Sequence, residues 1–179
     1  MQHTLKSPVT FTGVGLHSGK PATMVLKPAA AGHGIWFKRT DIELGNALIP
    51  AIYDVVERTP LCTRLVNEDG VSISTIEHVM AALAGCGIHN ALIEVNGPEV
   101  PILDGSAAQI VEAILSAGVQ PLDAKVRALK VLRPVEVRQG QAVARIEPAD
   151  RLYIDFSIDF PDAAIGAQSR ELDMANGAF

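Results

Sequence analysis

Glu77 and His78 are the adjacent residues whose types point most directly to chemistry. Residues 74–85 predict a helix, because apolar side chains recur there at helical spacing and Ser74 or Thr75 could cap its start. In the first turn, the positive end of the helix dipole favours an ionised glutamate and a neutral histidine. These are the protonation states of a general base and a metal ligand, a pairing that zinc hydrolases use.

The same pair also permits a structural interpretation, in which a capped helix simply carries a hydrogen-bonded imidazole. Spacing alone favours this second interpretation, and the HExxH spacing of a metalloprotease helix is absent. His78 lies opposite the apolar stripe formed by Ile76, Val79 and Leu83, beside small residues. This arrangement predicts burial of both helix faces, with room for another helix, a second domain or a ligand.

Asp104 and His17 are weaker candidates, each with two interpretations. Asp104 precedes Ser106, which has capping-box spacing to Gln109, so it either caps this turn or orients a catalytic group. His17 lies in a glycine-flanked turn over residues 13–20 and is either a turn residue, which we favour, or part of a pocket. His3 and His33 are expected in solvent-facing loops, and His89 in a turn.

Composition restricts the class of protein. The 179 residues carry 15 Lys and Arg against 20 Asp and Glu, a net charge of −5, which argues against a nucleic-acid partner. We expect no transmembrane segment and no secretory signal, because no apolar run is long enough and the N-terminus lacks an apolar core. Cys62 and Cys86 lack Cys-x-x-Cys spacing and are expected to be buried and reduced, so a cytoplasmic location is predicted.

The pattern of elements predicts an α+β chain. Strands are expected at residues 9–13, 22–27, 34–38, 61–66, 71–73 and 91–95, with helices at 74–85 and 106–118. Residues 1–123 therefore form a two-layer sandwich domain, a sheet plus two main helices. After a linker at 120–125, strands at 128–137, 142–147 and 152–160 begin a second, similar domain over residues 124–179, and the ending at 175–179 suggests a truncated chain.

Six segments in order resemble one family. They are GVGLHSGK (13–20), FKRTD (37–41), LCTRLV (61–66), STIEHVMAALAGCGIHNALIEV (74–95), PEVPILDGSA (98–107) and IDFSIDFP (154–161). Together they resemble the UDP-3-O-acyl-N-acetylglucosamine deacetylases, zinc amidases that commit Gram-negative bacteria to lipid A synthesis. The resemblance implies two similar α+β domains that hold the active site between their helix layers.

The resemblance also implies residue roles. The family's zinc is held by two histidines and an aspartate, of which His78 matches the first, while Glu77 matches the general base that activates water for attack on the substrate acetamide. Leu61, Cys62 and Thr63 match a stretch that lines the metal site and substrate groove. Asp104 matches a family aspartate that supports the catalytic groups. Asp159 and Phe160 match family positions near the uridine of the substrate.

Part of the family's pattern has no counterpart in these residues. The other two zinc ligands and a later histidine lie in the second domain beyond residue 179, and Asp162-Ala163 stands where the family often has His-Pro. We therefore expect a truncated enzyme, monomeric when complete, that binds zinc weakly and is inactive alone. The alternative is a non-catalytic binding or scaffold module that retains the first domain of the deacetylase.

Overall fold

The computed structural model describes residues 1–174. Residues 175–179, the ending that suggests truncation, lie outside the described residues. The chain divides into two compact units, Met1–Val126 and Arg127–Phe179. No helix within residues 1–174 is long and apolar enough to cross a membrane.

The first unit is built on a five-stranded sheet with strand order β2-β3-β9-β4-β5. β4 and β9 pair in parallel, whereas the other neighbours are antiparallel. Ala22, Met24 and Leu26 are all buried and alternate with half-buried residues, so the predicted period of two is confirmed. The strands are β2 (Val9–Val14), β3 (Pro21–Pro28), β4 (Ile35–Arg39), β5 (Leu48–Pro50) and β9 (Ala91–Val95).

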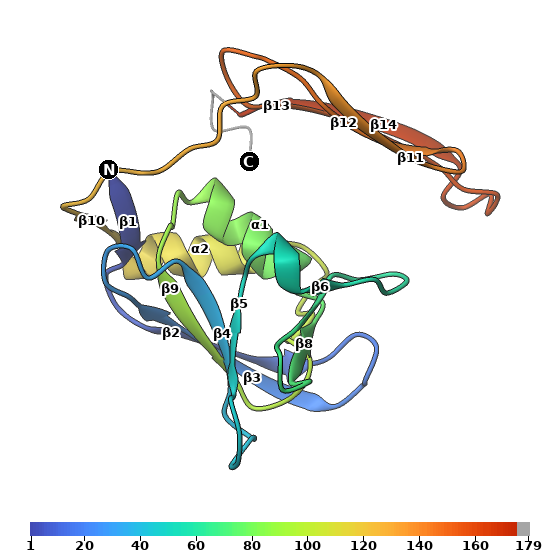
Figure 1. Ribbon diagram of the computed structural model, residues 1–179. Helices are drawn as coiled ribbons and strands as arrows, with labels where there is room; N and C mark the ends of the chain where they lie inside the picture. The colour runs from blue at the N-terminus through green and yellow to red at the C-terminus, as the bar shows by residue number, and fades with distance from the viewer. Residues whose placement is uncertain (175–179) are drawn as a thin grey trace. The chain divides into compact units, whose positions relative to one another are not determined.

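Two helices lie on one side of this sheet, α1 (Glu77–Gly85) and α2 (Ala108–Ala117) (Figure 1). They bury Val79, Leu83 and Ile114 in one core with the sheet's apolar side chains. Full burial of a side chain of this size contributes roughly 1.5–3 kcal/mol. The predicted two-layer α+β fold is thereby confirmed.

The starts of both helices differ from the prediction. The N-cap of α1 is Ile76, without a side-chain hydrogen bond, because the Thr75 hydroxyl donates to Glu99 instead of capping the helix. The N-cap of α2 is Ala107, so the predicted capping box does not form. The hydroxyl of Ser106 nevertheless accepts a 3.1 Å bond from the N–H of Ala108, which satisfies one of the free donors of that helix.

A strand pair that the sequence did not predict ties the two ends of the first unit together. β1 (Gln2–Leu5) pairs antiparallel with β10 (Val119–Leu122). The linker expected at residues 120–125 is therefore wrong over its first half. The two strands lie more than a hundred residues apart, so no local pattern indicates their pairing.

A small three-stranded sheet leads into α1. It consists of β6 (Val56–Glu57), β7 (Arg64–Val66) and β8 (Ser72–Ser74), and β7 and β8 form an antiparallel hairpin. The hairpin turn predicted from NEDG is confirmed, since Oδ1 of Asn67 accepts hydrogen bonds from the N–H groups of Asp69 and Val71. β8 ends three residues before the first residue of α1.

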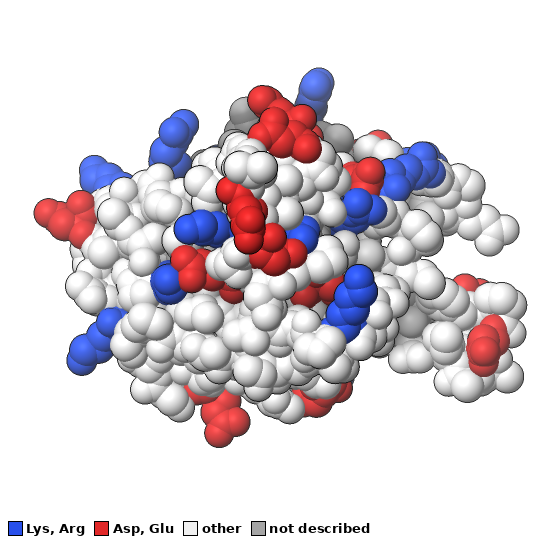
Figure 2. All heavy atoms as spheres, turned by 90° about the horizontal axis from the view of Figure 1, so that it is seen from below, with Lys and Arg blue, Asp and Glu red and all other residues white. Residues whose placement is uncertain are grey.

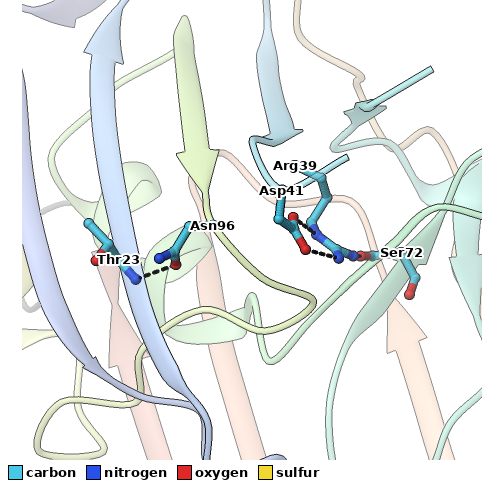
Figure 3. A network of polar contacts seen from close by, with 5 residues as sticks. All are labelled: Thr23, Arg39, Asp41, Ser72 and Asn96. Carbon is cyan, nitrogen blue, oxygen red and sulfur yellow. Dashed lines mark hydrogen bonds and ion pairs between the residues drawn. The ribbon is translucent and has the colours of Figure 1, made fainter. Parts of the chain in front are cut away.

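The buried side chain of Arg39 joins the main sheet to this small sheet. Arg39, 8% exposed, donates from Nε and Nη2 to the two carboxylate oxygens of Asp41 at 2.8 and 2.7 Å, and from Nη1 to the Ser72 carbonyl at 2.7 Å (Figure 3). The hydrogen bonds and charge of Arg39 lower the pKa of Asp41. Two-pronged contacts of this kind fix direction as well as distance, so β4 and β8 are held in one arrangement.

The second unit consists of two antiparallel hairpins, and its strands differ in part from the prediction. One strand begins seven residues later than the expected 128, beyond Pro134, and the turn at Gln139-Gly140 is confirmed. The fourth strand was not predicted. The hairpins pair β11 (Val135–Gln139) with β12 (Ala142–Ile146), and β13 (Tyr153–Asp159) with β14 (Ala167–Asp173).

Candidate active site

The loop before β7 and the start of α1 meet at Glu77. The N–H of Thr63 donates a 3.0 Å hydrogen bond to Oε2 of Glu77. In return, the Thr63 carbonyl accepts from the N–H groups of Thr75 and Ile76, at 3.0 and 3.4 Å. Oε1 of Glu77 has no hydrogen-bond partner within residues 1–174. One carboxylate oxygen is therefore fixed and the other is free to accept a proton.

His78 follows Glu77 on α1 and is half-buried. None of the hydrogen bonds within residues 1–174 involves its imidazole, and both the structural and the catalytic interpretation of His78 stay open. Val79 and Leu83 are buried, but Ala84 and Gly85 are exposed. The described residues thus cover one side of α1, whereas the sequence predicted burial of both.

Leu61 and Cys62 adjoin this pair. Leu61 has a φ of +67° and is 86% exposed, and Cys62 is half-buried with its carbonyl accepting a 2.9 Å bond from the Thr59 hydroxyl. A positive φ at a non-glycine residue costs on the order of 1–3 kcal/mol, and such residues cluster at functional sites. The structure therefore brings the predicted residues Leu61, Cys62, Thr63 and Glu77 into one region.

A cavity of about 380 Å³ opens beside this region. It is lined by residues of four segments, among them His17, Cys62, Arg64 and Glu99. His17 lies in the predicted turn and also lines the cavity, so both of its interpretations hold. Nε of Arg64 is buried and has no hydrogen-bond partner within residues 1–174. The cavity thus offers polar groups from segments that are far apart in the sequence.

Glu99 is a site residue that the sequence analysis missed. It is 4% exposed, and its carboxylate accepts bonds from the N–H groups of His17 and Ser18 at 2.9 and 2.8 Å, and from the Thr75 hydroxyl at 2.8 Å. Burial raises the pKa of Glu99, but these hydrogen bonds outweigh it and lower the pKa to about 2. The available signal was an acidic residue between two prolines in an otherwise apolar loop.

Asp104 organises the start of α2. Its Oδ1 accepts 3.0 Å hydrogen bonds from both N–H and Oγ of Ser106, and these bonds lower the pKa of the exposed carboxylate. The turn-capping interpretation of Asp104 is therefore confirmed. Its role in supporting the catalytic groups stays a prediction.

Asp159 and Phe160 belong to the second unit. Asp159 is the last residue of β13 and pairs with Ala167, while the N–H of Phe160 donates a 3.1 Å bond to the Gly166 carbonyl. Phe160 is 47% exposed. Their contact with uridine stays a prediction.

The remaining histidines and the two cysteines differ in exposure and in hydrogen bonding. His3 is half-buried in β1, not in the expected loop, and its N–H donates to Nδ1 of His89 at 3.1 Å. Burial and the nearby charge of His3 lower the pKa of His89. His33 is exposed, as predicted. Cys62 and Cys86 are free and half-buried, and burial raises the pKa of the Cys86 thiol.

Charged side chains of both signs are interspersed on the face shown in Figure 2. Some charged side chains of the first unit form ion pairs, such as Lys27 with Glu94 at 2.7 Å and Arg64 with Glu57 at 3.1 Å. Exposed pairs of this kind contribute little to stability, typically about 0–1 kcal/mol. On the face shown, the described residues form no continuous area of one sign (Figure 2).

The fold and the site together define a two-layer α+β domain in which Glu77 and His78 are adjacent at the start of a helix and a hydrogen bond holds one oxygen of the Glu77 carboxylate. The family described as UDP-3-O-acyl N-acetylglycosamine deacetylase matches residues 2–179, and the chain belongs to this family. The family resemblance inferred from the sequence is thus confirmed.

Relatives of similar sequence carry the same description. The UDP-3-O-acyl-N-acetylglucosamine deacetylase of Photobacterium profundum is 48% identical over 171 residues, 96% of this chain and 56% of the relative. Those of Shewanella pealeana and Histophilus somni are 46% and 43% identical over 180 residues, which cover 99% of this chain and 58% and 59% of the relatives. The chain therefore spans less than two thirds of the length of these relatives.

Proposed function

We propose that this chain supplies the first domain of a zinc-dependent amidase that removes acetate from UDP-3-O-acyl-N-acetylglucosamine. The observation that carries the proposal is the pair at the start of α1: Oε2 of Glu77 is held by the Thr63 N–H, whereas Oε1 and the His78 imidazole have no hydrogen-bond partner within residues 1–174. Membership of the deacetylase family supports the substrate and the reaction.

The donor groups of this chain fit zinc only in part. The half-exposed imidazole of His78 is a suitable ligand, but residues 1–174 contain no group of three His, Cys, Asp or Glu side chains that could hold a metal. Catalytic zinc sites normally have three protein ligands. We therefore propose that the ligands other than His78 come from the part of the relatives' length that this chain does not span.

The proposed reaction uses the chain's own residues as follows. Zinc, when bound, would supply Lewis-acid polarisation of the acetamide carbonyl and a lower pKa for the attacking water. Oε1 of Glu77 accepts the proton of that water, because Oε2 is occupied by the Thr63 N–H. The water oxygen bonds to the carbonyl carbon, the C–N bond breaks, and the departing nitrogen takes up the proton that the water lost, so that acetate is released and the amine stays on the sugar.

Other residues hold the substrate and the catalytic groups in this proposal. The loop of Leu61, Cys62 and Thr63 borders the acetamide, with Cys62 on the wall of the cavity. Asp104 supports the catalytic groups, and Asp159 and Phe160 contact the uridine, where an aromatic face can stack on the base. The free state of both cysteines supports a reducing, cytoplasmic location, and we propose a monomer at the committed step of lipid A synthesis in a Gram-negative bacterium.

A hybrid enzyme tests the proposal. In it, this chain replaces the matching first part of the Photobacterium profundum relative. We expect the hybrid to release acetate from UDP-3-O-acyl-N-acetylglucosamine, as the relative does in a parallel assay, and the 179-residue chain to show no turnover alone. A hybrid that is folded by circular dichroism and binds zinc, yet releases no acetate, would contradict the proposal.

A further inference from the structure

The Glu99 carboxylate links three segments behind the catalytic pair. It is 4% exposed, and it accepts hydrogen bonds from the N–H groups of His17 and Ser18 and from the Thr75 hydroxyl. The first two donors belong to the loop between β2 and β3, and Thr75 connects β8 to α1. A buried carboxylate with three donors in place has few alternative arrangements.

Thr75 is the point at which this link reaches the catalytic pair. Its φ is +64°, in the left-handed region that β-branched residues avoid, and it is 1% exposed. Two hydrogen bonds hold it there: its hydroxyl donates to Oε1 of Glu99, and its N–H donates to the Thr63 carbonyl. Because Thr75 lies two residues before Glu77, its backbone angles set the direction in which α1 begins.

The loop at residues 15–18 is fitted closely around the same carboxylate. Gly15 is buried, and a Cβ at this position would overlap Oε2 of Glu99 and Oγ of Ser18. The N–H of Gly15 donates to the Lys20 carbonyl and its carbonyl accepts from Gly19, so the loop is closed on itself. Glu99 therefore meets a preformed loop on one side and Thr75 on the other.

We propose that Glu99 is a positioning residue: through Thr75 it holds the start of α1 so that Glu77 reaches the Thr63 N–H and His78 stays aligned beside it. The inference rests on the proposed deacetylase function for its catalytic consequence. The structural part of the inference, that Glu99 and Thr75 control the Glu77–Thr63 contact, does not depend on that function.

Thr75→Val tests the link, because valine keeps the β-branched shape and removes only the hydroxyl. In the 179-residue chain carrying Thr75→Val, we expect the Thr63 amide hydrogen to exchange with solvent roughly 10-fold faster than in the unmodified chain. Exchange is measured by NMR under conditions in which the two chains have the same free energy of unfolding. In the hybrid enzyme, we expect kcat to fall roughly 10–100-fold with KM changed less than about twofold, as expected for misplaced catalytic groups. Thr75→Ser keeps the hydroxyl and is expected to restore both values.

Thr4→Val is the matched control. Thr4 is also buried at 3% exposure, and its hydroxyl donates a 2.7 Å bond to the Asn90 carbonyl, away from Thr63. We expect this variant to lose stability and to leave Thr63 exchange and kcat unchanged. If Thr75→Val does not fold, Thr75→Gly decides by the same readouts, because glycine adopts a φ of +64° freely.

Two results would overturn the inference. One is an exchange rate of the Thr63 amide in Thr75→Val that equals the rate in Thr4→Val at the same free energy of unfolding. The other is a kcat that is lowered in Thr75→Val and equally lowered in Thr75→Ser. An inactive hybrid with the unmodified sequence contradicts the proposed function instead, and the Thr63 exchange measurement then still decides the positioning role.

Discussion

The N–H of Thr63 and Oε2 of Glu77 are joined by a 3.0 Å hydrogen bond across 14 residues of sequence. This bond connects the segment before β7 to the first turn of α1. It fixes one of the two oxygens of the Glu77 carboxylate, and the other has no hydrogen-bond partner within residues 1–174. A proton acceptor needs such a fixed position to meet a reacting water at hydrogen-bond distance. The bond therefore orients the glutamate of a common Glu-His dipeptide.

Glu77→Gln tests the proton acceptor. Glutamine keeps an oxygen for the Thr63 N–H but cannot hold the proton of the attacking water, so we expect kcat of the hybrid enzyme to fall by roughly 10²–10⁴. Acetate release gives the rate, and isothermal titration gives the zinc affinity, which should stay within a few-fold. Near-normal turnover would contradict the role of Glu77 as the base.

His78→Ala tests the metal ligand. Loss of a residue that only hydrogen-bonds to a metal ligand typically weakens metal binding roughly 10–100-fold. Because His78→Ala removes a ligand itself, we expect zinc binding by the hybrid enzyme to weaken by more than this. Glu77→Gln serves as the control, since it alters the neighbouring residue and keeps the imidazole. The 179-residue chain, with one ligand in its described part, is expected to bind zinc weakly, and nanomolar affinity would contradict the proposed ligand set.

Glu99 predicts a specific dependence of stability on pH. Its pKa is lowered from 4.5 to about 2 in the folded chain, so the unfolded chain binds the proton first as the pH falls. The stabilisation, about 3 kcal/mol, is fully present above about pH 4.5 and is lost as the pH falls toward 2. Urea unfolding from pH 7 down to pH 3 should show a smaller acid loss for Glu99→Gln than for the unmodified chain.

The control for this pH dependence is Glu112→Gln, which changes an exposed residue of α2 and should reproduce the acid loss of the unmodified chain. Identical pH profiles for Glu99→Gln and Glu112→Gln would show that the hydrogen bonds to Glu99 do not stabilise its ionised form.

Gly15→Ala should destabilise the first unit. The added methyl group would overlap the Glu99 carboxylate, which three hydrogen bonds hold in place, and overpacking of this kind typically costs about 1–3 kcal/mol. Gly97→Ala is a matched control, because Gly97 is also buried and a Cβ there meets nothing within 4 Å, so its effect should stay within about 0.5 kcal/mol. Equal urea midpoints for the two variants would contradict the close fit around Glu99.

Local patterns in the sequence were sufficient for much of the fold. The alternation in β3, the compact apolar run of β9 and the NEDG turn each express a regular backbone geometry, and such geometry repeats at short spacing. The pairing of β1 with β10 was not predictable in this way. Both strands are short, and their pairing is defined only when the two ends of the first unit meet.

The sequence by itself determined which residues could do chemistry: Glu77 and His78 are adjacent, and helical spacing places them in the first turn of α1. Only the tertiary structure decided how Glu77 and the start of α1 are held, through the bonds from Thr63 to Glu77 and from Thr75 to Glu99. The physical reason is that a hydroxyl or carboxylate can bond equally well to many partners. The partner is chosen by which groups the packed core brings within about 3 Å, and these lie 14 and 24 residues away along the chain.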